Sequence, residues 1–444
     1  MALSLRRYAW PSYQNSDDHL DCILRERSQK EREMSIAMET MTGDPLPEDV
    51  IIEILSRLPV KNLLQFKCVC KSWYAIITSP NLISKHLRNY YDKNDSDCLL
   101  AQYCVTQAGE IASFELLVDE TPTRALSYGS LHLMRFHSPY IYGPCDGIFY
   151  MYGHFYDYRA LWNPAVNELK TLPPIPNPPF SFSYSPRYDA YGFRLHPVTK
   201  DYEVIVMREY WREEEGAWDE DRYPLSVFVY TLSSDSWRYW GDLSRYYHLR
   251  NNKCYICVKG VFYWLGSYGA CGDPEVAIYF DMATNVCQEI QLPDYDKSYN
   301  CESLAVYKDS IALPVVQERV LHVWTLDERC WTKTFVVGPL LGVQYPVGHW
   351  QNNTLILMSD SCELLLCDPR TQEITGLGFE GRTIRCVGIF AYKESLVPVK
   401  NGHEEAETIS DGKITCSSSN RNVASNEESF LMDPDYEEAL KLFD

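Results

Sequence analysis

The sequence lacks the features that would carry a chain into or across a membrane. No stretch of about 18 apolar residues occurs, which argues against a membrane-spanning helix. The N-terminus has no uninterrupted apolar region of the kind found in secretory signals, and Asp17, Asp18 and Asp21 disfavour an organelle transit peptide. We therefore expect a protein of the cytoplasm, with the nucleus as a second location, and no membrane partner.

Basic residues are also scarce relative to acidic ones. The 41 Lys and Arg residues face 61 Asp and Glu residues, so the formal net charge is −20. This balance excludes nucleic acid as a partner, because binding phosphates needs clustered positive charge. Residues 98–400 alone carry −11. A basic partner is favoured, although an acidic surface can also serve only solubility.

Signatures of metal, cofactor or catalytic chemistry are missing as well. The pair Cys254 and Cys257 has zinc spacing but no partner pair, so we predict no metal and read the 16 cysteines as free thiols. No phosphate-binding glycine loop, zinc-protease helix or nucleophile elbow occurs, and we expect no cofactor. Asp281 and Asp368 are expected to cap hairpin turns. The chain is predicted to be no enzyme; the alternative is a propeller enzyme with a convergent site.

The chain divides into four regions of different composition. We interpret 1–43 as a polar N-terminal extension, 44–90 as a helical domain, and 98–398 as a β domain. Residues 399–444 are rich in Ser, Asn and acids, and are predicted to be a disordered acidic tail.

The segment PLPEDVIIEILSRLPVKNLLQFKCVCKSWYAIITSP predicts three short helices. Pro47, Glu48 and Asp49 suit a first helical turn, and Pro59 ends that helix. The second helix is expected over roughly 60–69 and the third over roughly 71–79, ended by Ser79-Pro80. Three such helices hold more large apolar side chains than they can bury among themselves. The excess face either docks on the chain's own β domain or binds a partner protein.

This segment resembles the F-box, the motif that binds the Skp-family linker of SCF ubiquitin ligases. The resemblance implies a linker-binding surface and, through the linker, a cullin and a RING subunit as further partners. The signature positions are Leu46, Pro47, Ile54, Leu55, Leu58, Pro59, Leu63, Val69 and Trp73.

The β domain contains a repeat. Five segments align without gaps, starting at 161, 229, 279, 323 and 366, and each predicts a β-hairpin. Runs such as 147–150, 260–264 and 354–357 precede three of them and predict inner strands. Spacings of about 40–50 residues favour propeller blades. The strands near 98–118 and 384–398 would together form a sixth blade; a β-sandwich is the alternative.

The region 44–400 resembles plant F-box proteins with an F-box-associated, kelch-like domain. The stretches GPCDGIFYMY, LWNPAVNELKTLP, YGFRLHPVTKDYEV and AYKESLVPV carry this resemblance. The fold class implied is mixed: a small all-α three-helix F-box followed by an all-β, six-bladed kelch-like propeller. YGPCDG, YFDMATN and WTKTFVVGPL are most similar to the S-locus F-box group, which recognises basic style ribonucleases in self-incompatibility. A general or defence-related F-box receptor is the alternative.

One loop is unusual. Residues 212–222, REEEGAWDEDR, place six acidic residues around one tryptophan. We expect a target-binding loop with an aromatic anchor, the alternative being a solvated insertion. Its candidate residues are Glu213, Glu214, Glu215, Trp218, Asp219, Glu220 and Asp221.

Overall fold

The structure is a computed structural model of the full chain, and it forms two compact units, residues 1–58 and 59–444. The residues that it describes are 47–91, 98–105, 111–118, 123–128, 139–153, 158–177, 184–212, 225–243, 247–249, 255–268, 276–281, 284, 286–295, 304–307, 310–349, 354–361, 363–376 and 384–400. The predicted extension 1–43, the tail beyond residue 400, Leu46 and residues 213–222 of the acidic loop lie outside these ranges.

The first unit is described from Pro47 onward and contains helix α2 (Glu48–Leu55). Pro47 is the N-cap residue, one position before the helix, so its missing N–H costs no hydrogen bond. Glu48 and Asp49 occupy the first turn, where a negative charge is stabilised by the helix dipole. The predicted start is therefore correct.

The second unit begins with three helices, α3 (Val60–Phe66), α4 (Lys71–Ile77) and α5 (Pro80–Tyr91). The three helices predicted for residues 45–80 are α2, α3 and α4, whereas α5 was not predicted, because Ser79-Pro80 starts a helix as well as ending one. Proline suits a first helical position. The hydroxyl of Ser79 accepts a hydrogen bond from the backbone N–H of Leu82 at 3.2 Å, which caps the new helix. Helices α3 and α4 also end two or three residues earlier than predicted.

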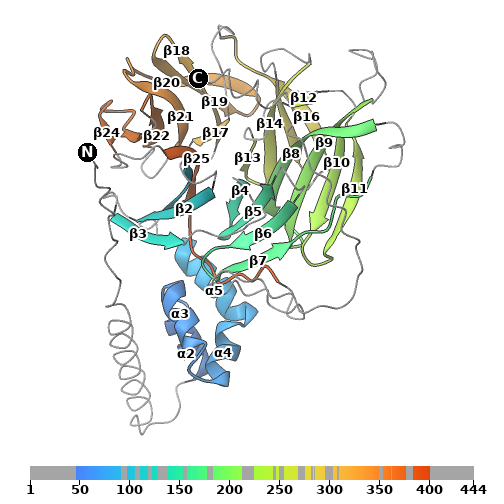
Figure 1. Ribbon diagram of the computed structural model, residues 1–444, viewed down its shortest axis with the longest axis vertical. Helices are drawn as coiled ribbons and strands as arrows, with labels where there is room; N and C mark the ends of the chain where they lie inside the picture. Colours follow the sequence, from blue (N-terminus) through green and yellow to red (C-terminus); the bar gives the residue numbers. More distant parts are fainter. Residues whose placement is uncertain are drawn as a thin grey trace, which may run out of the picture. The chain divides into compact units, whose positions relative to one another are not determined.

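The described strands of the second unit form six antiparallel sheets (Figure 1). Sheet I joins β25 (Ile384–Tyr392), β1 (Cys98–Val105), β2 (Ile111–Val118) and β3 (Thr123–Tyr128). Sheet II contains β4 (Tyr140–Cys145), β5 (Ile148–Gly153), β6 (Tyr158–Asn163) and β7 (Glu168–Thr171). Sheet III contains β8 (Tyr184–Leu195), β9 (Tyr202–Arg212), β10 (Ser226–Thr231) and β11 (Ser236–Asp242).

The remaining sheets repeat the same order. Sheet IV contains β12 (His248–Leu249), β13 (Tyr255–Val258), β14 (Val261–Ser267), β15 (Val276–Asp281) and β16 (Val286–Gln291). Sheet V contains β17 (Ala305–Tyr307), β18 (Ser310–Gln317), β19 (Val320–Asp327) and β20 (Cys330–Val337). Sheet VI contains β21 (Val343–His349), β22 (Leu355–Ser359), β23 (Leu364–Cys367) and β24 (Ile374–Gly376).

The five predicted hairpins are the last two strands of sheets II to VI. They are the antiparallel pairs β6–β7, β10–β11, β15–β16, β19–β20 and β23–β24, so this prediction is confirmed. The three predicted inner strands are β5, β14 and β22, and each pairs with the hairpin that follows it. Asp368 caps its turn by accepting the N–H of Arg370 at 2.8 Å, while Asp281 accepts the hydroxyl of Thr284 at 2.7 Å.

Side chains alternate between the two faces of each sheet, and both faces are buried against neighbouring sheets. In β9, Val204 and Val206 pack toward sheet II, whereas Ile205 and Met207 pack toward sheet IV. This explains why the sequence shows short continuous apolar runs instead of strict alternation. An apolar cluster fills each junction between neighbouring sheets, including those of sheet I with sheets VI and II.

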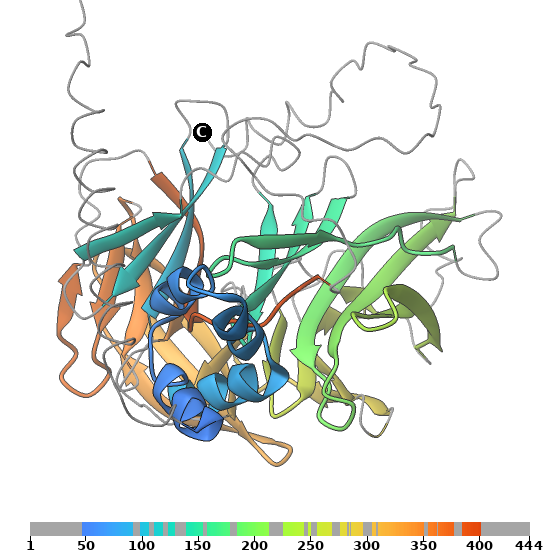
Figure 2. The same cartoon turned by 90° about the horizontal axis from the view of Figure 1, so that it is seen from below.

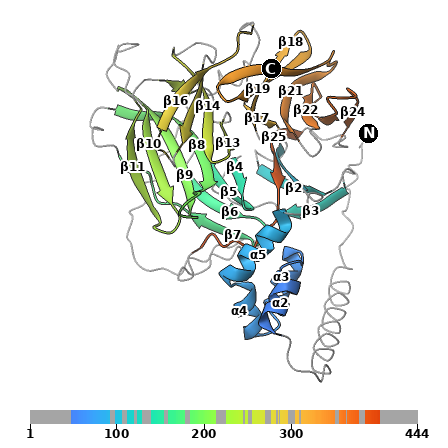
Figure 3. The same ribbon diagram turned by 180° about the vertical axis from the view of Figure 1, so that it is seen from behind.

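The sheets close into a ring. Strand β4 contacts β8, β8 contacts β13, and the series continues through β17 and β21 to β25, which contacts β4 again. Figure 2 shows the sheets following one another in the order of their colours. Sheet I pairs β1 with β25, as predicted, and so joins the two ends of the β domain (Figures 1 and 3). The described strands form a ring of sheets and not two packed sheets, so the architecture is a β-propeller and the sandwich alternative is wrong.

Candidate functional site

The first unit exposes part of the predicted linker-binding surface. Ile54, in the last turn of α2, is 50% exposed, and Pro47 is also exposed. Leu55 is only 2% exposed and Leu58 is half-buried. Val50, which the signature positions do not include, is 40% exposed and lies one turn before Ile54 on the same face of α2. Val50 and Ile54 therefore present an apolar stripe along this helix.

The helices of the second unit expose a further set of apolar side chains. Val69, in the turn after α3, is 52% exposed, and Pro59 is exposed as well. Leu63 is fully buried. Trp73 is half-buried, and its ring meets that of Phe66 edge-on at 5.3 Å between centroids. Tyr74 is 56% exposed. The sequence did not predict it as a binding residue; only its neighbour Trp73 is a signature position.

These observations divide the nine signature residues by accessibility. Pro47, Ile54, Pro59 and Val69 are available to a partner, while Leu55 and Leu63 are buried. Leu58 and Trp73 are intermediate, and Leu46 lies outside the described residues. Large exposed apolar side chains are characteristic of interaction sites.

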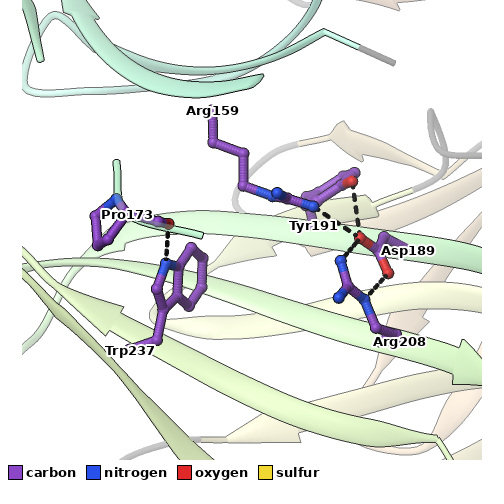
Figure 4. A network of polar contacts seen from close by, with 6 residues as sticks. All are labelled: Arg159, Pro173, Asp189, Tyr191, Arg208 and Trp237. Carbon is purple, nitrogen blue, oxygen red and sulfur yellow. Dashed lines mark hydrogen bonds and ion pairs between the residues drawn. The ribbon is translucent and has the colours of Figure 1, made fainter. Parts of the chain in front are cut away.

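A polar network lies between sheets II and III (Figure 4). Asp189 of β8 accepts two hydrogen bonds from Arg208 of β9, both at 2.7 Å, in a bidentate arrangement. Arg159 of β6 reaches the same carboxylate at 3.3 Å, and the Tyr191 hydroxyl donates to it at 3.1 Å. Burial, with Asp189 beside it, raises the pKa of Tyr191, so the hydroxyl stays protonated. The network therefore holds two buried guanidinium groups on one carboxylate.

The position of this network links it to the predicted target-binding loop. Arg208 lies four residues before the end of β9 at Arg212, and it pairs in register with Ser226, the first residue of β10. Residues 213–225 connect those two strands in the sequence, and they contain the candidate loop residues. The network thus stiffens the end of the sheet from which the loop departs.

Tryptophan side chains connect neighbouring sheets in a second way. The indole N–H of Trp237, the second residue of β11, donates to the carbonyl of Pro173 at 2.7 Å (Figure 4). The indole N–H of Trp331, the second residue of β20, donates to the carbonyl of Gln291 at 2.9 Å. Each contact ties an outer strand to the chain at the end of the preceding sheet. The propeller is therefore a rigid scaffold for its loops.

Four described cysteines, Cys145, Cys257, Cys287 and Cys367, are at least partly buried. Burial raises the pKa of the Cys257 thiol to about 11 and that of Cys287 to about 12, and it also raises those of Cys145 and Cys367. These thiols are protonated near neutral pH and are poor nucleophiles. Within the described ranges, no three His, Cys, Asp or Glu side chains gather closely enough to hold a metal ion. The described helices also include none with the length and apolarity to cross a membrane.

Two protein families match the chain in the places where these structural parts lie. The F-box domain family matches residues 45–85, which include α2, α3 and α4. The F-box associated beta propeller domain family matches residues 129–395, more than half of the chain. The chain belongs to the F-box proteins with an F-box-associated β-propeller domain. F-box proteins generally act as non-catalytic adaptors of SCF ligases, and an F-box implies a Skp-family linker and a target protein as partners.

Similar proteins from Arabidopsis thaliana agree with this family. F-box/WD-40 repeat-containing protein 1 is 25% identical over 361 residues, covering 76% of this F-box protein and 81% of the relative. Another F-box protein is 27% identical over 348 residues, covering 74% and 85% of the two chains. A third is 26% identical over 290 residues, covering 64% and 70%. These likenesses support a plant F-box protein.

Proposed function

We propose that this F-box protein is the substrate-recognition subunit of an SCF-type cullin–RING ubiquitin ligase, acting in the cytoplasm or nucleus. The exposed apolar side chains of α2 and of the turn after α3 carry the proposal, because an apolar stripe along a helix suits the groove of a partner protein. They bind a Skp-family linker, and the linker brings a cullin and a RING subunit. The propeller holds the target, so the chain supplies proximity for ubiquitin transfer and no catalytic group.

Replacement of Ile54 or Val69 by Asp tests linker binding. Each change puts a charge on an exposed apolar side chain, so it should weaken co-purification with a Skp-family linker about tenfold or more while the chain stays folded. Val198→Asp is the control, because Val198 is 77% exposed on the β8–β9 turn of the propeller. Linker capture at wild-type levels by both test variants would show that the F-box surface is assigned wrongly.

The target is proposed to be a protein with a basic surface, bound through the acidic loop. Residues 98–400 carry a net charge of −11, and opposite charge speeds association. Replacing Glu213, Glu214, Glu215, Asp219, Glu220 and Asp221 by amides should slow association at low salt more than it speeds dissociation. Trp218→Ala should instead raise the dissociation rate, since an aromatic anchor holds a complex together. Unchanged association kinetics in the amide variant would show that the acidic loop is only a solvated insertion.

The identity of the target is a further proposal, based on the resemblance to the S-locus group. The proposed targets are basic style ribonucleases. The alternative is that this protein is a general or defence-related receptor with another target. The stretches behind it belong largely to framework strands: YFDMATN begins in β15, and WTKTFVV lies in β20. Affinity capture from native tissue with mass spectrometry decides the question: recovery of ribonucleases supports the first target, and their absence among specific partners rejects it.

The number of blades is likewise proposed to be six, of the kelch-like kind. The six sheets of the described residues, and the closed series of contacts between strands of neighbouring sheets, support this number. A crystal structure gives the count directly, and a ring of five or seven sheets would overturn it.

A further inference from the structure

The segment after β25 is held against sheet II by a set of specific contacts. Residues 393–400 form no strand, yet Ser395 and Val399 are fully buried, and Leu396 and Val397 nearly so. Figures 1 and 3 show this segment, in red, running beside β7 and α5. We call residues 393–400 the strap. A terminal segment with this burial and no ladder of its own needs other groups to satisfy its backbone.

Asn163 is the central anchor of the strap. Its side-chain N–H₂ lies 2.8 Å from the carbonyl of Val397 and 3.2 Å from both the carbonyl and the hydroxyl of Ser395. Its side-chain oxygen accepts the N–H of Ala165 at 3.0 Å, which also shapes the β6–β7 turn. Asn163 is fully buried, so each of these contacts lacks competition from water.

Two further residues of sheet II hold the strap. Glu168 accepts the backbone N–H of Val399 at 3.0 Å. The hydroxyl of Ser395 donates to the carbonyl of Asp146. Gly147 has a φ of +77°, and a Cβ there would lie 2.7 Å from the carbonyl oxygen of Lys393, so the strap passes where only glycine fits.

The helices that follow the first unit meet the same place. Ile83 and Leu87 of α5 pack against the apolar cluster that contains Val397 and Val399. Lys67, in the turn after α3, interacts electrostatically with Glu168: burial lowers its pKa and Glu168 acts in the opposite direction. The apolar cluster that includes two strap residues therefore also receives α5, and Glu168, which binds the strap, also interacts with Lys67.

The convergence gives a role to sequence stretches that neither linker binding nor target binding uses. GPCDGIFYMY contains Asp146 and Gly147, LWNPAVNELKTLP contains Asn163 and Glu168, and AYKESLVPV is largely the strap itself. YGFRLHPVTKDYEV joins them through the Tyr202 hydroxyl, which donates to the Asp146 carboxylate at 2.9 Å. Three of these stretches come from strands of two sheets and one from the end of the propeller.

We propose that the strap fixes helix α5 to sheet II, with Asp146, Asn163 and Glu168 as positioning residues that set where a bound target lies relative to the linker. The effect of the strap on ubiquitin transfer rests on the proposed ligase function, whereas the contacts of the strap with sheet II do not. Because the strap and the apolar cluster both hold α5, they fix the orientation of this helix relative to sheet II. The lysines that receive ubiquitin then depend on this junction.

Hydrogen exchange of α5 in the full chain tests the junction. Asn163→Asp is nearly isosteric and keeps the turn cap, but it turns a donor into an acceptor facing three oxygen atoms. It should raise exchange of residues 80–91 about tenfold or more, because the buried carboxylate cannot donate the hydrogen bonds that hold the strap. Asn167→Asp is the matched control, an exposed residue in the same turn, and should change exchange by less than about twofold.

Truncation gives a second comparison. A chain that stops after Tyr392 keeps β25 but loses the strap, and should also expose α5 to exchange; a chain that stops after Lys400 should not. If Asn163→Asp or the shorter chain fails to fold, Val399→Thr, which places one hydroxyl in the buried strap, is used instead. Wild-type protection of α5 in folded variants lacking these contacts would overturn the proposal.

A final readout separates positioning from stability. In a complex reconstituted with linker, cullin, RING subunit, conjugating enzyme and ubiquitin, Asn163→Asp should redistribute ubiquitin among the chain's own lysines at unchanged linker affinity. A residue that served only propeller stability would raise exchange in β9 and α5 alike and leave the lysine pattern unchanged. Failure of the wild-type chain to bind linker would reject the ligase function. The exchange experiment would still show whether the strap holds α5 to sheet II.

Discussion

Individual side chains join the propeller sheets through polar contacts as well as through apolar clusters. The carboxylate of Asp189 serves two guanidinium groups and one phenol from β6, β8 and β9. None of these residues is adjacent to another in sequence, and the partner of an arginine or aspartate in a strand cannot be predicted from its neighbours. The network forms only because the fold places these strands side by side.

Neutralising Asp189 should destabilise the propeller strongly. In Asp189→Asn the two guanidinium groups lose the charge that compensates them while remaining buried, which we expect to cost about 3–5 kcal/mol. Urea unfolding of the full chain measures the change. Asp360→Asn, at an exposed position, is the control and should change stability by less than about 0.5 kcal/mol. Equal stabilities of the two variants would show that the network contributes nothing to the stability of the propeller.

Among single elements, helix α5 differs most from the expectation. In the sequence Pro80 predicts the end of the preceding helix, although proline is equally suited to begin the next one. The distinction depends on whether the residue before it can cap the new helix, and Ser79 does so through Leu82. The apolar residues Leu82, Ile83 and Leu87 then face one side, and the last two reach the propeller cluster.

Removal of the cap should weaken this helix specifically. Ser79→Ala deletes the oxygen that accepts the Leu82 N–H, so we expect a loss of about 1 kcal/mol. Exchange of the first α5 amides should rise while that of α4 is little changed. Ser84→Ala, an exposed change inside the same helix, is the control and should not raise exchange. An equal effect of both substitutions would mean that the cap contributes nothing.

At the scale of the whole molecule, closure of the ring depends on a pairing between distant segments. Strand β25 completes sheet I by pairing with β1 from Cys98–Tyr392 to Val105–Ile384. Without β25, sheet I loses one of its four strands, and the clusters on its two sides lose members such as Tyr392 and Ile389. Edge exposure and loss of burial would act together.

Truncation after residue 380 should therefore destabilise the entire propeller, whereas truncation after residue 400 should leave its melting temperature nearly unchanged. Calorimetry of both chains measures the difference. A chain stopped after Tyr392 separates closure from the strap, because it retains β25 and should keep most of the propeller's stability. A cooperative transition at the wild-type temperature for the chain ending at 380 would contradict closure through β25.

The sequence by itself determined the elements whose causes are local. Proline and acidic residues marked the start of α2, and turn residues between apolar runs marked five hairpins, because these preferences act within a few residues of the chain. The tertiary structure alone decided which F-box side chains are exposed, which strands share a polar network, and where Asn163 directs its amide. Those outcomes depend on contacts between residues up to 234 positions apart, as between Asn163 and Val397. No local preference encodes such a contact, because its free energy arises only when the ring of sheets brings both residues out of water.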